Sequence, residues 1–360
     1  MVYDLIVIGK GIAACAALIT LSKTNKRIAV IAPKAKADFK IGETLSPSAN
    51  VELKKLGIYS DFLTEGHLKA YSSFSSWGSD ELNEKYIWEA KQEAGWYIDR
   101  LNFEEFLWAK AQHTTFEYID DTLVQANFND DLWQVKTKSG QELTSRYVLD
   151  CSGRAAIVCR NFHKRKRLDK LVSIYTVLSQ KRSDVAPTVA SVVEALENGW
   201  MYSSLTPNNK LVVAYFTDSD LIPSEITKNL DSWKQFIAST RYTSKRIETA
   251  EFSITTLPHT VDAATIITHQ DKADTLLCAG DAVASFDPLS SHGMTTALWS
   301  GRKVAEAFID LTNSSTENLK NYKETLYQSI DNYILEKQKI YATEKRFAKN
   351  PFWSRRLFKE

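Results

Sequence analysis

Hydrophobic residues near the start of the chain form patterns typical of a strand, a helix and a second strand in succession. Apolar runs at 5–8 and 27–31 predict buried strands, and the segment 12–22 between them has the apolar content and length of a helix. A strand, a helix and a strand in so short a stretch predict a βαβ unit with parallel strands.

Later segments carry the helical period. A core-facing helix is predicted at 103–111, where one stripe is formed by Phe103, Phe106, Leu107 and Ala111. A second helix should pack on the sheet through Val51, Leu53 and Leu56. The segments 294–308 and 319–345 predict helices near the C-terminus, the latter as one or two elements.

Between residues 160 and 271 the pattern changes to short β-rich runs separated by turns such as 207–209. These runs predict a mostly antiparallel sheet, inserted between the N-terminal unit and the C-terminal helices. A helical stretch at 230–239 is expected to pack against this sheet.

The turn after the first predicted strand reads G-x-G-x-x-A, with Gly9, Gly11 and Ala14 at the three positions. Gly9 permits the sharp turn, Gly11 has no Cβ to block a pyrophosphate, and Ala14 lets the helix pack closely on the strand. The helix N-terminus adds free N–H groups and a positive dipole end. The motif therefore predicts a dinucleotide site.

One position departs from the usual dinucleotide pattern. An acidic residue normally follows the motif by about 20 residues and binds the adenosine ribose, whereas this chain has Ala32-Pro33-Lys34. The ribose contact then comes from elsewhere, binding is weak, or Lys34 receives a 2′-phosphate. The βαβ unit alone leaves FAD and NADP open.

Further motifs bear on this choice. Glu43 follows Gly42 ahead of the helix near 51–56, and Arg100 stands just ahead of the helix at 103–111, within reach of a phosphate or base. Asp150 ends a buried strand, and a small-residue turn through Gly153 follows.

The late stretch "CAGDAVASFDPLSSHGMTTALWSG" has the same form. A strand ends at Gly280-Asp281, a small-residue loop crosses to Gly293, and a helix begins at Met294. Taken in chain order with the N-terminal turn, these motifs favour a single flavin site.

Composition excludes several classes of protein. The 360 residues are 44% hydrophobic and 25% charged with a net charge of +1, so basic runs such as 164–167 are expected to be solvated surface and nucleic-acid binding is not expected. The four cysteines and six histidines lack metal-site spacing, and no metal is expected. The apolar N-terminus is too short and too interrupted to span a membrane. Free thiols indicate a reducing, cytoplasmic location.

On these motifs the chain resembles FAD-dependent monooxygenases of the glutathione-reductase-like type. It is nearest to the branch that contains tryptophan halogenases and geranylgeranyl reductases, in which "GET" follows the second strand and "DPLSSxG" precedes the last cofactor helix. The segments "SSWGSDEL" and "GWYIDRLNFEEFL" are similar to flavoproteins that modify a tryptophan of a partner protein, the maturation enzymes of glycine oxidase and lysine ε-oxidase.

The resemblance implies FAD as the cofactor. Asp281 would accept a ribityl hydroxyl, Gly280 would allow close approach, and the loop from Pro288 to Gly293 would lie along the isoalloxazine ring. The helix that begins near Gly293 and Met294 would direct its N–H groups at the N1–C2=O edge, where reduced flavin is negative.

It also implies a fold class, which is α/β, or α+β taken overall. Residues 1–160 and 270–312 would form a Rossmann FAD-binding domain, 161–269 an inserted, mostly antiparallel β substrate domain, and 313–360 C-terminal helices.

Candidate catalytic residues are His292, Trp200 and Tyr202. His292 is the ionisable group of the flavin loop, where a histidine can act as a general base or proton donor. Tryptophan halogenases carry W-x-W-x-I-P and a relay lysine beside the flavin. The nearest counterparts here are "WMYSSLTP", which lacks the Ile-Pro, and Lys69.

The resemblance implies hydroxylation of a tryptophan side chain in the precursor of a quinone-cofactor amino-acid oxidase, with O2 and an external electron donor as further partners. The alternatives are a small-molecule aromatic hydroxylase or halogenase, an isoprenoid-type flavin reductase, and a non-enzymatic FAD-binding partner protein.

Overall fold

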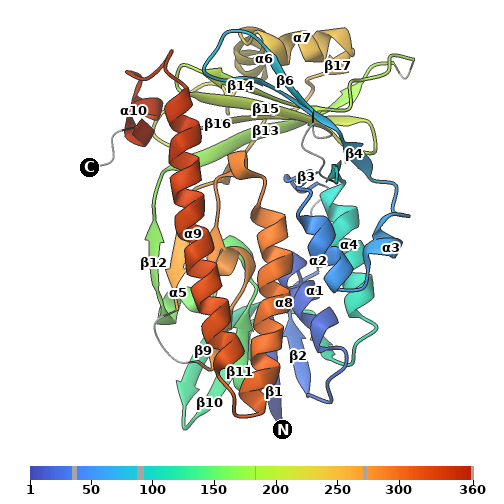
Figure 1. The fold of residues 1–360 in the computed structure, drawn as a ribbon, viewed down its shortest axis with the longest axis vertical. Coiled ribbons are helices and arrows are strands. Elements are labelled where there is room, and N and C mark those ends of the chain that lie inside the picture. Colours follow the sequence, from blue (N-terminus) through green and yellow to red (C-terminus); the bar gives the residue numbers. More distant parts are fainter. Residues whose placement is uncertain (35–38, 87–92, 183, 271–273, 358–360) are drawn as a thin grey trace.

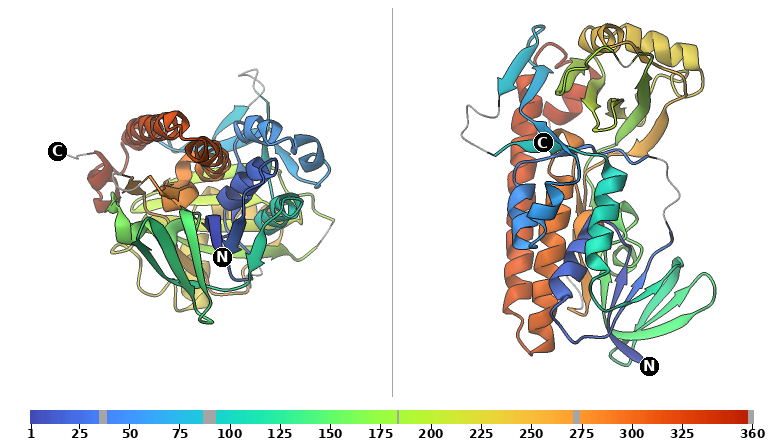
Figure 2. Two further views of the ribbon diagram at one scale, coloured as in Figure 1. Left: turned by 90° about the horizontal axis from the view of Figure 1, so that it is seen from below. Right: turned by 90° about the vertical axis from the view of Figure 1, so that its right-hand side faces the viewer.

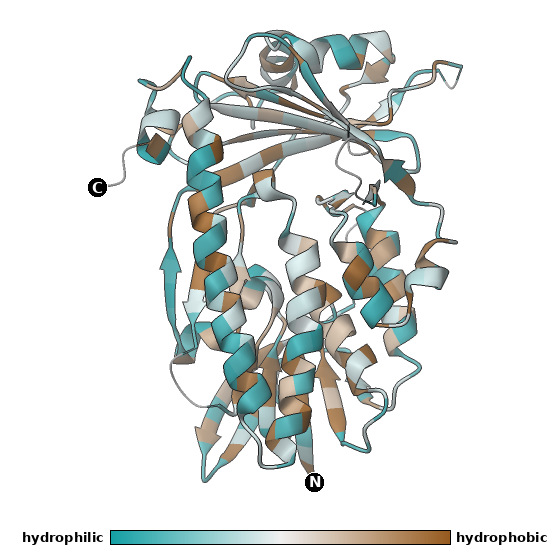
Figure 3. Cartoon of the chain, in the orientation of Figure 1, coloured by the Kyte–Doolittle hydropathy of each residue, from teal (hydrophilic) through white to brown (hydrophobic). Residues whose placement is uncertain are grey.

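Strands from both ends of the chain form one sheet in the computed structural model, which describes residues 1–34, 39–86, 93–182, 184–270 and 274–357 (Figure 1). Its parallel strands lie in the order β8 (Glu117–Ile119), β2 (Ile28–Ile31), β1 (Val2–Ile8), β11 (Glu142–Asp150) and β20 (Leu276–Cys278). The first half of β11 continues antiparallel into β10 (Leu132–Thr137) and β9 (Leu123–Asn129). Most residues of the parallel strands β1, β2 and β20 are apolar and lie buried in the hydrophobic core (Figure 3).

Helices line up beside this sheet, as the right-hand view of Figure 2 shows. They are α1 (Ile12–Leu21), α4 (Arg100–Ala111), α8 (Gly293–Thr312) and α9 (Glu317–Thr343), with α2 (Ala49–Lys55), α3 (Tyr59–Phe62) and α5 (Cys159–Phe162) as shorter elements. α1 and α8 pack very closely, since a Cβ built on Gly301 would lie 2.1 Å from the carbonyl oxygen of Ala13. One hydrophobic core thus joins the two chain ends.

A second, larger sheet lies above the first in Figure 1. Its strands are β17 (Phe252–Ser253), β13 (Leu171–Gln180), β16 (Lys210–Asp218), β15 (Gly199–Leu205), β14 (Ser191–Leu196), β5 (Ser72–Ser76) and β6 (Asn83–Tyr86), with β18 (His259–Asp262) also paired to β13. All pairings are antiparallel except that of β14 with β5. α6 (Leu230–Ala238) and α7 (Tyr242–Thr249) cover its outer side.

Two small sheets connect these layers. One contains β12 (Lys164–Arg167), β19 (Ile266–His269) and β21 (Ala284–Ser285), and the other β3 (Thr44–Leu45), β7 (Gly95–Tyr97) and β4 (Leu68–Ala70). The long α9 runs beside both large sheets and reaches α10 (Pro351–Leu357) at the far end (Figure 1). α9 buries Leu319, Tyr322, Leu326 and Ile330 at helical spacing.

The mixed α/β fold and the β1–α1–β2 unit predicted from sequence are confirmed. Two details differ from the expectations. Val51 was expected to pack on the sheet together with Leu53, but it is 47% exposed on α2, whereas Leu53 is fully buried. β5 and β6 belong to the larger sheet although they lie within the range 1–160, because β5 pairs with the edge of β14.

The expectation of free thiols is wrong for two of the four cysteines. Cys159 and Cys278 form a disulfide, while Cys15 and Cys151 are free and buried. The parallel pairing of β11 with β20 places Cys278 opposite Asp150, and the Asp150 carboxylate accepts the N–H of Cys159 at 2.8 Å. The two thiols therefore meet, although they are far apart in sequence.

Along the described ranges, the structure contains no helix that is long and apolar enough to cross a membrane.

Candidate functional site

A cavity of about 810 Å³ is lined by residues of both large sheets. Its lower wall comes from the turns after β1 and β11, from the segment around β20 and from the start of α8. Its upper wall comes from β13, β15 and β16. The volume is that of a cofactor or ligand site, and the cavity is where most of the predicted residues meet.

The glycines of the first turn have different tasks. Gly9 has φ +103°, and a Cβ there would lie 2.5 Å from the carbonyl oxygen of Cys151, so Gly9 allows β1 and the β11 turn to approach. Gly11 lines the cavity, and a Cβ built on it would meet no atom within 4 Å. Ala14 is fully buried in α1 and does not line the cavity. Gly11 is therefore the position that leaves room for a ligand.

Two helices begin at the cavity. Gly11 precedes α1, and Gly293 and Met294 open α8; all three residues line the cavity. Neither N-terminus has a side-chain cap, so the N–H groups of the first turns remain available to an anion or a carbonyl oxygen. Gly280, which also lines the cavity, has φ +62°, and a Cβ there would lie 2.9 Å from the Cβ of Ala13.

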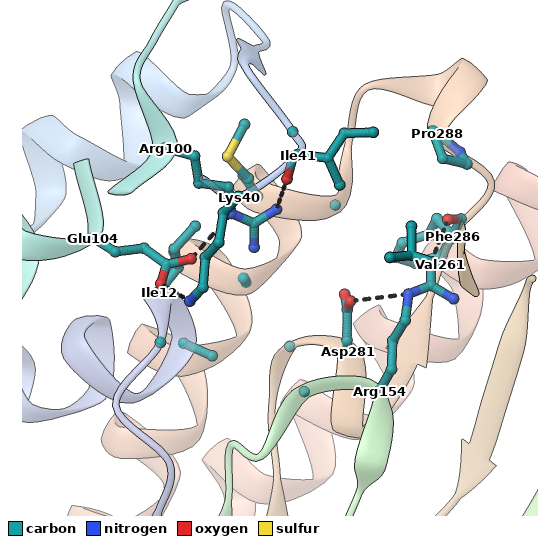
Figure 4. Close-up of a pocket in the computed structure, with 18 of the residues that line it drawn as sticks. Ile12, Lys40, Ile41, Arg100, Glu104, Arg154, Val261, Asp281, Phe286 and Pro288 are labelled. Carbon is teal, nitrogen blue, oxygen red and sulfur yellow. Dashed lines mark hydrogen bonds and ion pairs between the residues drawn. The ribbon is translucent and has the colours of Figure 1, made fainter. Parts of the chain in front are cut away.

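Arg100 lies on one side of the cavity in an ion-pair cluster (Figure 4). Its Nε is 3.0 Å from Glu104, and its Nη1 donates to the carbonyl oxygen of Ile41 at 3.1 Å. Lys40 contacts the other carboxylate oxygen of Glu104. Burial disfavours the charged form of Glu104, but Arg100 and Lys40 outweigh it and hold the pKa of Glu104 below its usual value.

Asp281 faces Arg154 on the opposite side of the cavity (Figure 4). The Nε of Arg154 is 3.6 Å from the Asp281 carboxylate, and its two other nitrogens donate to the carbonyl oxygens of Ala264 and Phe286. Arg154 is thus fixed by backbone groups and leaves the Asp281 carboxylate at the cavity wall. Asp281 and Gly153 both line the cavity, as expected.

Asp150 has a different place from the expected one. It is fully buried and does not line the cavity. Its carboxylate accepts the N–H groups of Ser152, Val158 and Cys159 and the hydroxyl of Ser152. Asp150 therefore shapes the turn that carries Gly153 and Arg154, and acts on the cavity only through this turn.

The segment in which Ala32, Pro33 and Lys34 replace the usual acidic residue lies in the cavity wall. Ala32, Pro33 and Lys34 line it, and the ammonium of Lys34 is 3.3 Å from Asp120, which follows β8. The neighbouring strand thus places a carboxylate next to the position where β2 lacks one.

The upper wall is aromatic. Trp200 stacks on Phe216 with ring centroids 4.0 Å apart and an interplanar angle of 15°. The hydroxyl of Tyr202 is 2.6 Å from the hydroxyl of Thr44. Glu43 is 2% exposed and lines the cavity beside them, and burial raises its pKa. Desolvation likewise raises the pKa of Tyr202. Trp200, Tyr202 and Glu43 are therefore brought together.

Two further candidates lie outside the cavity lining. His292 is exposed, and Pro288, which the same loop carries, lines the cavity. Lys69 is exposed on β4, with its ammonium 5.9 Å from the ring centroids of Tyr71 and Trp96. In the described part of the chain, no cluster of three or more His, Cys, Asp or Glu side chains could hold a metal ion.

The lining residues fit FAD. Gly11, Gly153 and Gly293 present bare backbone, since a Cβ on any of them would have no atom within 4 Å. Helix N-termini and arginines suit the pyrophosphate, and the aromatic upper wall suits a flat ring. These residues would hold the dinucleotide from Gly11 to Met294.

Several lining residues were not singled out from sequence. Arg154 ends the small-residue turn that follows Asp150, and Asp287 stands in the quoted "DPLSS" loop, so proximity to these motifs was an available signal. Thr44 ends the quoted "GET" motif, whereas Phe216 and Trp108 lie in an ordinary strand and an ordinary helix, and their contribution depends on tertiary packing alone.

Known proteins resemble this chain along most of its length. Over an alignment of 366 residues, the FAD-dependent oxidoreductase LodB of Marinomonas mediterranea is 28% identical, covering 98% of this chain and 96% of LodB. The structure of the myxobacterial chondrochloren halogenase CndH matches with a TM-score of 0.86 and 18% identity, over 100% of this chain and 86% of CndH. That of the peptidyl tryptophan dihydroxylase QhpG, essential for tryptophylquinone biogenesis, matches with a TM-score of 0.77 and 18% identity, over 99% of this chain and 79% of QhpG.

The sequence model of the tryptophan halogenase family matches residues 81–357, well over half of the chain. The chain therefore belongs to the tryptophan halogenase family.

Proposed function

We propose that this FAD-dependent oxidoreductase is a monooxygenase that hydroxylates a tryptophan side chain of a precursor protein during tryptophylquinone biogenesis. FAD, reduced by an external donor, supplies two electrons and activates O2. One oxygen atom enters the indole ring, and the other leaves as water with two protons. The chain's residues bind the cofactor, orient the indole and move the protons.

The observation that carries the proposal is the composition of the upper wall. It offers a stacked Trp200–Phe216 pair, the Tyr202 hydroxyl and the Glu43 carboxyl. Among the described residues, the lysines of the cavity wall are Lys10, Lys34 and Lys40, and none of them lies on β13, β15 or β16, which form the upper wall. Since Lys69 is also outside the wall, the relay lysine that the halogenases use has no counterpart there. Oxygen transfer without a halide relay fits this wall better.

Two similarities support a protein substrate. LodB matches over nearly its whole length, and QhpG, which shares the fold, is a peptidyl tryptophan dihydroxylase. An aromatic wall suits an indole, because aromatic rings pair at centroid distances of about 4.5–7 Å with a gain beyond simple burial. A flavin reductase of isoprenoid type would need an apolar tunnel, whereas Glu43, Tyr202 and Ser173 make this wall polar in part.

Co-expression with candidate precursor oxidases tests the proposal. The intact mass of the matching partner should rise by one or two oxygen atoms, and peptide mapping should place them on a tryptophan. The incorporated oxygen should derive from labelled O2. A chain that binds FAD but leaves every partner unmodified, and halogenates a free aromatic in the presence of bromide, would establish the halogenase alternative instead.

A further inference from the structure

β18 is an edge strand of the larger sheet, and one side of its backbone is unpaired. It pairs with β13 alone. Ala263, directly after β18, donates its N–H to the carbonyl oxygen of Leu171 at 3.0 Å, and in an antiparallel pair such bonds recur at every second residue. The backbone groups of Thr260 and Asp262 therefore point away from β13. No backbone partner for them occurs among the residues that the structure describes. A free edge of this kind can bind another extended chain.

This edge adjoins the cavity. Val261 and Asp262 line the cavity wall, and Figure 4 shows Val261 beside Arg154. The guanidinium of Arg167 holds the Asp262 carboxylate through contacts of 2.9 and 2.7 Å and so fixes the end of β18. Residues that lie opposite each other on paired strands direct their side chains to the same face of the sheet. A residue placed opposite Val261 on the free edge would therefore direct its side chain into the cavity.

Aromatic side chains continue from the cavity wall to the surface. Tyr175 pairs with His259 across β13 and β18, and their ring centroids are 5.6 Å apart. The ring centroid of Phe39 is 6.3 Å from that of Tyr175. Tyr175 is two residues from Ser173, which lines the cavity, so both lie on the same face of β13. Phe39, Tyr175 and His259 form an aromatic shelf beside the free edge.

Ser173 carries a polar group that is left for a ligand. It is 2% exposed and lines the cavity, and its hydroxyl has no hydrogen-bond partner in the described part of the chain. Leaving a buried hydroxyl unpaired is costly. Ser173 lies opposite Val261 in the β13–β18 register, on the side away from the free edge. A ligand that passes Val261 and carries an N–H group, as an indole does, would satisfy this hydroxyl.

We propose that β18 is the docking edge for the precursor protein, an inference that rests on the proposed hydroxylation. The tryptophan-bearing segment of the precursor adds to β18 as an extended strand and bonds through its backbone to Thr260 and Asp262. Its tryptophan lies opposite Val261, the indole ring enters the cavity, and the Ser173 hydroxyl accepts the indole N–H. The flanking residues rest on the aromatic shelf. Backbone bonds supply affinity, and the cavity selects the tryptophan.

The first test uses the FAD-loaded protein and synthetic peptides that span each tryptophan of a candidate precursor oxidase. One peptide should bind and should slow hydrogen–deuterium exchange of the Thr260 and Asp262 amides, because these amides become bonded. Methylating the peptide nitrogens of the two residues that flank its tryptophan should weaken binding about tenfold, because two backbone hydrogen bonds are lost while the indole is kept.

The second test uses variants of the chain. Thr260→Pro removes an outward N–H at an edge position that tolerates proline, and should raise the KM for the precursor about tenfold while FAD stays bound. Thr255→Pro, at an exposed threonine ahead of β18, is its matched control. Ser173→Ala should weaken binding of the tryptophan peptide about fivefold but not that of a 1-methyltryptophan peptide, which lacks the indole N–H. Ser179→Ala, at an exposed serine of β13, should change neither.

Hydroxylation of a precursor with unchanged exchange at Thr260 and Asp262 would overturn the docking edge and leave the proposed function standing. Equal binding of the methylated and unmethylated peptides would do the same. If Thr260→Pro does not fold, the exchange measurement on the wild type decides. Slowed exchange that depends on the concentration of the protein itself, without peptide, would assign the edge to a second copy of this chain. If no precursor is hydroxylated, the proposed function fails, and this inference fails with it.

Discussion

The hydroxyl of Tyr341 donates to the carboxylate of Asp287 across 2.8 Å and so joins the C-terminal helix α9 to the loop before α8. The same hydroxyl accepts the indole N–H of Trp200 at 3.1 Å. Tyr333 accepts the N–H of Asp287 at 2.7 Å. Although the described residues of α9 contribute nothing to the cavity lining, α9 holds the cavity wall at Asp287 and Trp200.

Replacing Tyr341 by Phe should therefore weaken both the fold and the flavin site. The change removes the Tyr341 donor from Asp287 Oδ2 and the acceptor from the Trp200 N–H, both in buried places, at a cost of about 1–3 kcal/mol for each group. Urea unfolding should show the loss of stability, and titration with FAD should show weaker binding. Tyr71→Phe, at an exposed tyrosine, should change neither quantity. Equal stability of Tyr341→Phe and wild type would contradict the linking role.

The two glycines of the first turn should respond differently to a side chain. Gly11→Val should give a folded but colourless protein, because the new side chain enters only the cavity. Gly9→Val should prevent correct folding, because the φ of Gly9 is +103° and a Cβ there would collide with the Cys151 carbonyl group. Circular dichroism and bound-flavin absorbance separate the two effects. A yellow Gly11→Val protein would show that the dinucleotide lies elsewhere.

The Cys159–Cys278 disulfide closes a loop of 119 residues and should stabilise the fold. For a loop of this size, the loss of chain entropy in the unfolded state amounts to about 4–5 kcal/mol. A reducing agent should lower the melting temperature of the wild type but not that of a Cys159→Ser, Cys278→Ser double variant. Thiol counting after denaturation without reductant should give two free thiols; a count of four would refute the bridge.

His67 should make stability depend on pH. Burial against Phe62 lowers the pKa of His67 to about 4, and its buried Nε2 has no hydrogen-bond partner among the residues that the structure describes. The unfolded chain takes up a proton near pH 6.5, whereas the folded chain does not until about pH 4. Stability should therefore fall as the pH drops from 6.5 to 4. His67→Leu should flatten this part of the urea-unfolding profile, whereas His113→Gln, at an exposed histidine, should leave its slope unchanged.

The N-terminal unit could be predicted because its information is local. The strand, turn and helix of residues 1–31 follow directly from apolar periodicity and from the glycines at fixed spacing, and the structure starts α1 at the predicted residue, Ile12. The placement of β20 beside β11 and of β5 beside β14 could not be predicted. Periodicity tells which face of a strand is buried, but the choice of a distant partner strand is made by the tertiary packing of both.

The candidate site shows the same limit. Gly11, Asp281 and Met294 were recognised from motifs and line the cavity. The motif predicted that Asp150 binds the cofactor and did not reveal its role in shaping the turn, because two of its three N–H donors, Val158 and Cys159, reach it only once the chain after the turn has folded back. The link from Tyr341 to Asp287 arises from the docking of α9, and no local pattern reports it.

The contact between Ala13 and Gly301 has a consequence for biosynthesis. The first helix leaves the ribosome long before the segment that covers it has been translated, so its apolar surface has no native partner during most of elongation. A nascent chain of this kind needs a chaperone or an interim collapse to stay soluble. It can take up its cofactor only once almost the entire polypeptide has emerged.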